Sequence, residues 1–66
     1  MGTLTALPSG YRVDIRGVPK WTLIYLIDEA TGARVTSSPF RISQGIPEKL
    51  AVAAAVAHWR ERGLIA

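Results

Sequence analysis

One run of eight residues, Trp21–Asp28, constrains the fold of this chain more than any other feature. Its residues favour β-structure, and side chains along a strand alternate between the two faces of a sheet. Both faces are then mainly apolar: one carries Trp21, Leu23, Tyr25 and Ile27, and the other carries Thr22, Ile24 and Leu26. A strand of this kind needs a covering layer on each face. The sequence therefore predicts a central strand with more apolar surface than one small layer hides.

The size and composition of the chain make it harder to cover this apolar surface within one molecule. At 66 residues we expect a single domain, residues 1–66. Such a domain buries only roughly 60% of the surface of its unfolded chain, and it commonly needs a staple to be stable. The absence of cysteine and the single histidine, His58, argue against a disulfide and against an all-protein zinc site. With a hydrophobic fraction of 48%, we expect a homodimer or docking on a larger protein.

The two segments before the central run are predicted to form the first strand and the turn of a hairpin. Tyr11–Arg16 alternates apolar and charged residues, which predicts a strand with its charged side chains in solvent. Gly17–Lys20 predicts a turn, because Pro19 has no N–H for a sheet ladder. Residues 1–9 are expected to be flexible or to add an edge strand.

The residues after the central run predict a third strand and a helix. Glu29–Gly32 is typical of a tight hairpin loop, and Ala33–Ser37 is expected to return as a weaker third strand. Ser38-Pro39 would end this strand, and Phe40 and Ile42 would lie at the edge of the core. A helix is predicted from Pro47, at its first position, to Arg62, with Gly63 as the residue that ends it.

The predicted helix also has two apolar faces. One stripe consists of Val52, Ala55, Val56 and Trp59, and the roughly opposite one consists of Leu50, Ala53, Ala54 and Ala57. A helix that covers a sheet needs only one such stripe. We expect the stripe that contains Trp59 to pack on the sheet, which leaves the alanine-rich stripe for a partner.

These elements predict an α+β fold, in which a three-stranded antiparallel meander (β-β-β-α) packs on one C-terminal helix. The face of Trp21–Asp28 that meets the helix stays open at this stage. Because surplus apolar surface usually marks association, we expect a protein interface on the central strand. Its candidate residues are Trp21, Ile24, Tyr25 and Leu26.

The sequence offers little for catalysis, and we do not expect an enzyme. No serine has a histidine nearby in sequence, no glycine-rich phosphate loop is present, and the acidic residues form no obvious catalytic pair. His58 and Glu61 could share a helix face as half of a metal site, although a surface histidine is the favoured interpretation. We expect no catalytic residues, metal, cofactor, small-molecule substrate or membrane contact. Without cysteine or a signal peptide, the expected location is the cytoplasm.

Arginine dominates the charge of the chain. Eight Lys and Arg residues against five Asp and Glu residues give a net charge of +3, and six of the eight are arginine. Arg12 and Arg16 lie four residues apart on one strand face, and Arg34 on the third strand could join them. A sheet that presents arginines can enter the major groove of DNA, where arginine pairs with guanine.

A family resemblance supports this second possibility. It rests on Gly10-Tyr11-Arg12-Val13, Arg16, Lys20-Trp21, Asp28, Thr31-Gly32-Ala33-Arg34-Val35, Phe40, Glu48, Leu50-Ala51 and Ala53-Ala54. This pattern, over about residues 10–58, resembles the AP2-type DNA-binding domain and the related arm-binding domains of tyrosine integrases. The resemblance implies a three-stranded sheet on one helix that binds DNA through Arg12, Arg16 and Arg34, flanked by Trp21. The family carries charged residues on the second strand, whereas this chain has apolar ones there, which favours a protein interface.

Overall fold

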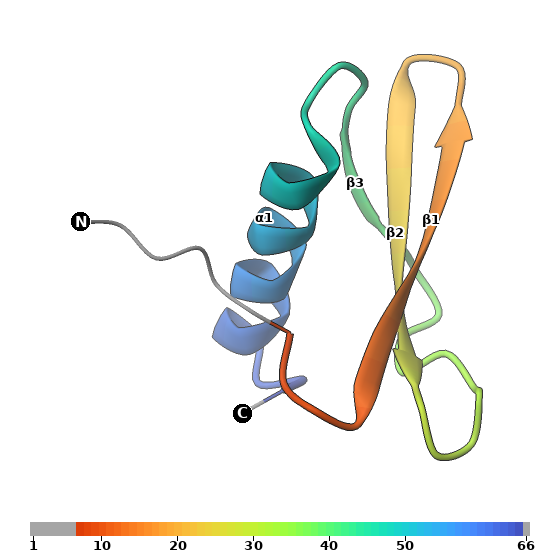
Figure 1. Cartoon of the computed structure of the whole chain (residues 1–66), viewed down its shortest axis with the longest axis vertical. Helices are drawn as coiled ribbons and strands as arrows, with labels where there is room; N and C mark the ends of the chain where they lie inside the picture. Colours follow the sequence, from red (N-terminus) through yellow and green to blue (C-terminus); the bar gives the residue numbers. More distant parts are fainter. Residues whose placement is uncertain (1–6, 66) are drawn as a thin grey trace.

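A computed structural model describes residues 7–65 as an antiparallel sheet with one helix against it (Figure 1). The elements are β1 (Tyr11–Val18), β2 (Trp21–Asp28), β3 (Phe40–Ser43) and α1 (Glu48–Glu61). The strand order β1-β2-β3 makes β2 the central strand. The predicted α+β meander with a C-terminal helix is confirmed. The possible edge strand near the N-terminus falls largely outside the described residues.

The core lies between α1 and one face of the sheet. On β2, Ile24 and Leu26 are both 0% exposed, and they pack in one cluster with Val56 and Trp59 of the helix. The predicted helix stripe is confirmed, since Ala55, Val56 and Trp59 are buried and Val52 packs against them. Ala51 joins these buried residues.

This burial corrects the assignment of Ile24 and Leu26 to a protein interface. Val13 of β1 pairs with Leu26, and Ile15 pairs with Ile24. On the other side of β2, Phe40 of β3 also pairs with Ile24. Cross-strand partners share a face of the sheet. The face with Ile24 and Leu26 is therefore the one on which all three strands are apolar, and the helix covers it.

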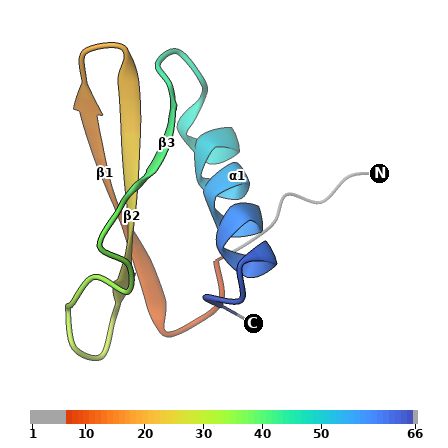
Figure 2. The ribbon, with the colours of Figure 1, turned by 180° about the vertical axis from the view of Figure 1, so that it is seen from behind.

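The third strand lies later in the chain than predicted. Ala33–Ser37 is not a strand, and within it Arg34 forms only an isolated bridge with Ile27. The chain then leaves the sheet edge and returns as β3, which Figure 2 shows as the green segment beside β2. The polar segment Thr36–Pro39 explains the departure: the Thr36 hydroxyl donates to the carbonyl of Ser38 (2.8 Å), and Pro39 has no N–H for a ladder.

The end of α1 forms the predicted glycine cap. Gly63 has a φ of 78°, and the Leu64 N–H donates to the carbonyl of Trp59 at 2.9 Å. Leu64 and Ile65 then fold back onto the core. At the other end, Pro47 is the N-cap residue rather than the first helical residue. Within residues 7–65, no helix has the length and apolar character needed to cross a membrane.

The turn between β1 and β2 carries backbone strain at Lys20, whose φ is 74°. A side chain with a Cβ atom is disfavoured there, whereas glycine is not. We expect Lys20→Gly to raise the free energy of unfolding by about 0.5–1 kcal/mol. Urea denaturation measures this change. Lys20→Ala is the matched control, because it removes the charge and keeps the strain; equal stabilisation by both variants would contradict the explanation.

Candidate nucleic-acid interface

The face of the sheet that points away from α1, called the outer face here, collects the arginines of three segments. Strand register decides its membership: Arg12 pairs with Ile27, Arg16 with Leu23, and Leu23 in turn with Arg41. The bridge between Ile27 and Arg34 adds a fourth arginine. The full set is Arg12, Asp14, Arg16, Val18, Trp21, Leu23, Tyr25, Ile27, Arg34, Arg41 and Ser43.

Two aromatic rings on β2 organise these arginines. The guanidinium carbon of Arg34 lies 4.0 Å from the centre of the Tyr25 ring, and that of Arg16 lies 6.0 Å from it. The guanidinium carbon of Arg41 lies 4.5 Å from the centre of the Trp21 ring. Each exposed cation–π contact is worth about 0.5–1 kcal/mol. The rings therefore hold guanidinium groups over the outer face, and all of these arginines are exposed.

The electrostatic balance of the outer face is strongly positive. Its four arginines are all exposed, and its one acidic residue is Asp14. The Asp14 carboxylate accepts a hydrogen bond from Nε of Arg16 at 3.3 Å, in an exposed ion pair. Such pairs contribute little to stability because water screens them. The remaining donors are available for an anionic partner.

The apolar residues of the outer face lie between arginines rather than in an open patch. Ile27 has Arg12 on one side and Arg34 on the other, and it is only 5% exposed. Half-buried Leu23 is flanked in the same way by Arg16 and Arg41. The aliphatic stems of arginine cover apolar surface while their charged ends stay in water. The arginine stems therefore cover the apolar residues on the outer face of β2, while the helix covers the inner face.

The structure brings the predicted DNA-contact residues together and divides the predicted protein-interface residues. Arg12, Arg16 and Arg34 share the outer face with Trp21 and Tyr25. Ile24 and Leu26 lie in the core instead.

Sequence reasoning missed Arg41, because the third strand was placed too early in the chain. The signal was nevertheless present in the alternation Phe40-Arg41-Ile42-Ser43. Once Phe40 and Ile42 pack toward the core, the intervening Arg41 must face the other way. This one residue provides the guanidinium that lies over Trp21.

Neither related proteins nor a metal site assigns a function to this chain. Comparison with family models, with curated proteins and with solved structures gives no match. Among the described residues, no group of three or more His, Cys, Asp or Glu side chains is placed to hold a metal ion.

Proposed function

We propose that this protein is a non-catalytic module that binds double-stranded DNA through the outer face of its sheet. The observation that carries the proposal is the set of four exposed arginines on one face, three of them beside the rings of Tyr25 and Trp21. Guanidinium groups bind phosphates through paired N–H donors, and they also pair with the major-groove edge of guanine. The outer face has these donors in excess.

The shape of the sheet suits a DNA groove. The major groove is about 12 Å wide and admits a two-stranded β-ribbon. Arg12 and Arg16 on β1 and Trp21 and Tyr25 on β2 occupy such a ribbon. The similarity to AP2-type domains supports the proposal by analogy, since those domains also bind DNA through a three-stranded sheet. The second strand of those domains carries charged residues, whereas β2 is apolar. In this structure, arginines on the two neighbouring segments flank the outer-face residues Leu23 and Ile27 of β2.

A salt titration tests the proposal. We expect a fluorescently labelled duplex of mixed sequence to bind at low salt, with an affinity that falls steeply as salt is added. The logarithm of the binding constant should fall with the logarithm of the salt concentration by about 0.9 for each phosphate contacted. Fluorescence anisotropy measures both quantities. No binding at low ionic strength would overturn the proposal.

Self-association through α1 is the second candidate, and the exposed apolar side chains at the start of this helix favour it. Leu50 is 48% exposed, and Ile46, just before the helix, is 39% exposed. The two lie four residues apart in the sequence, at the start of the helix. A homodimer formed here leaves the outer face open, so both proposals can hold together. As a module of this kind, the protein would work in the cytoplasm.

The dimer makes a separate prediction. In sedimentation velocity experiments at micromolar concentration, we expect the wild-type protein to sediment as a dimer and Leu50→Glu to sediment as a monomer. A buried apolar contact is lost in that variant and an unpaired charge is placed in its position. Lys49→Glu, at the neighbouring exposed position, is the control and should remain dimeric. A monomeric wild-type protein would rule out the homodimer.

A further inference from the structure

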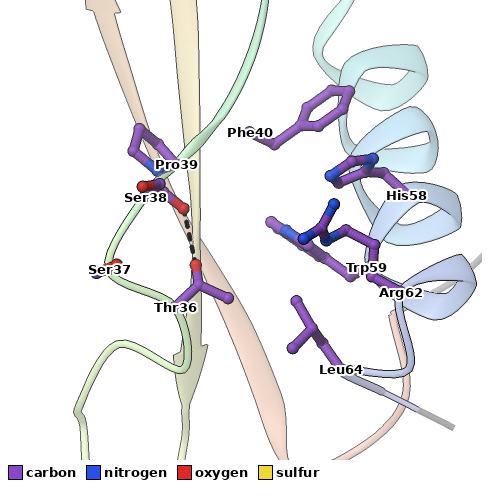
Figure 3. A pocket seen from close by; sticks show the side chains of 9 residues that line it. All are labelled: Thr36, Ser37, Ser38, Pro39, Phe40, His58, Trp59, Arg62 and Leu64. Atoms are coloured by element: carbon purple, nitrogen blue, oxygen red, sulfur yellow. Dashed lines mark hydrogen bonds between the residues drawn. The ribbon is translucent and has the colours of Figure 1, made fainter.

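A cavity of about 310 Å³ lies between the β3 edge of the sheet and the end of α1, behind the outer face (Figure 3). Its walls are the segment Thr36–Pro39, Phe40, His58, Trp59, Arg62 and Leu64. Small-molecule sites typically start at about 300 Å³ and combine apolar walls with a few polar groups. This cavity has both, and the proposed DNA contacts use none of it.

The polar side chains on the walls of the cavity all carry at least one hydrogen-bond donor. Figure 3 shows the side chains of His58, Trp59 and Arg62 extending from α1 toward the opposite loop. That loop contributes the serines Ser37 and Ser38. Among the described residues that line the cavity none is acidic, so no described side chain on its walls competes for the guanidinium of Arg62. The cavity therefore presents donors without a matching carboxylate.

The indole of Trp59 provides an independent indication of a ligand. Its side chain is almost fully buried, with 2% of the residue exposed. Within the described part of the chain, no group accepts a hydrogen bond from its Nε1–H. The described residues also contain no buried side-chain nitrogen or oxygen that lacks a partner. The indole N–H must therefore reach a surface, and the cavity is the surface that Trp59 lines.

Hydrogen bonds at the end of α1 satisfy several carbonyl groups close to the cavity. A helix C-terminus carries partial negative charge on its last carbonyl groups. Here the carbonyls of His58, Trp59 and Arg60 accept hydrogen bonds from the N–H groups of residues 62–64. These bonds occupy three of the carbonyl oxygens at the end of the helix, which reduces the number of free acceptors that would repel an anion.

We propose that this cavity binds a small ligand that carries a phosphate or carboxylate group on an aromatic or apolar body. The Arg62 guanidinium and the Trp59 indole N–H hydrogen-bond the anionic group, and the serine hydroxyls add donors from the loop. The apolar body packs against Phe40 and Leu64. The ring of Phe40 already lies 5.2 Å from the imidazole of His58, centre to centre, which gives a flat ligand an aromatic wall.

Phenyl phosphate, benzoate and benzyl alcohol are the probes for this proposal. We expect at least one of the two anions to shift the NMR signal of the Trp59 indole N–H in a saturable way at millimolar concentration. The signal of Trp21, on the outer face, reports separately any binding of the anion to the arginines there, and it should not follow the saturation curve of Trp59. Benzyl alcohol has the ring without the anionic group and should leave the Trp59 signal unchanged. Binding by one anion alone would identify the preferred group.

Substitutions of two exposed arginines near the end of α1 distinguish binding in the cavity from general attraction of the anion to positive charge. Arg62→Ala is expected to weaken binding of the anion about tenfold, as the loss of a hydrogen bond to a charged group does. Arg60→Ala removes the same charge outside the cavity and should leave binding within about twofold of the wild type. Equal weakening by both variants, an equal shift with benzyl alcohol, or no saturable shift would each overturn the proposal.

Discussion

Replacement of Leu26 by lysine is expected to unfold most of the protein at room temperature. Leu26 is 0% exposed in the core. Truncation of a buried leucine to alanine alone costs about 2–5 kcal/mol, and a buried ammonium group adds a desolvation cost. A domain of this size has a total stability of about 3–5 kcal/mol. Circular dichroism should therefore show loss of the helix and the sheet.

The neighbouring residue on β2 is the matched control. Tyr25 lies on the outer face and is half-buried beside Arg34. Tyr25→Lys should remain folded, with a loss of about 1 kcal/mol from the cation–π contact and like-charge repulsion. A folded Leu26→Lys protein, or an unfolded Tyr25→Lys protein, would show that the helix covers the other face of the sheet.

The second large effect is expected at the outer face. The double variant Arg34→Ala/Arg41→Ala removes the two guanidinium groups that lie closest to aromatic rings, at 4.0 and 4.5 Å. We expect affinity for duplex DNA at low salt to fall about 100-fold, at about 1.4 kcal/mol for each lost arginine contact. The salt slope should also decrease by about one for each arginine that contacts a phosphate.

The control is a second double variant that has the same net charge as the first. Lys49→Ala/Arg60→Ala removes two positive charges from exposed positions on α1. It should reduce the affinity only slightly, through the weaker long-range attraction. Fluorescence anisotropy over the same salt range measures both proteins. Similar losses in the two variants would mean that net charge, and not the outer face, governs binding.

The sequence predicted β1, β2 and α1 well because their local signals are strong, whereas it placed the third strand too early in the chain. Alternation in Tyr11–Arg16 and the glycine cap at Gly63 are features that neighbouring residues determine. The orientation of β2 is different, because both of its faces are apolar and its own sequence cannot distinguish them. The register with β1 and β3 decides it by placing Val13, Ile15 and Phe40 beside Ile24 and Leu26. Taken alone, β2 therefore led to the interface assignment that the structure corrects.

Prediction of the candidate site also requires long-range information, namely the position at which the third strand pairs with β2. Arg12 and Arg16 were assigned to one face correctly, since two positions on a strand suffice for that. The site also includes Arg41, and its position over Trp21 requires knowledge of where the third strand pairs. The chain between Arg34 and Phe40 leaves the sheet where the Thr36 hydroxyl donates to the carbonyl of Ser38 and where Pro39 has no N–H for the ladder. Strand propensity alone does not reveal such a detour.

The simple order of the strands has a consequence for how quickly the protein folds. Each strand pairs with the strand nearest to it in sequence, and a two-residue turn links β1 to β2. Closure of short loops costs little entropy, so the rate of folding rises as contacts become more local. The β1–β2 hairpin can form first and offer Ile24 and Leu26 as the surface on which α1 docks. We expect refolding in milliseconds, without a populated intermediate.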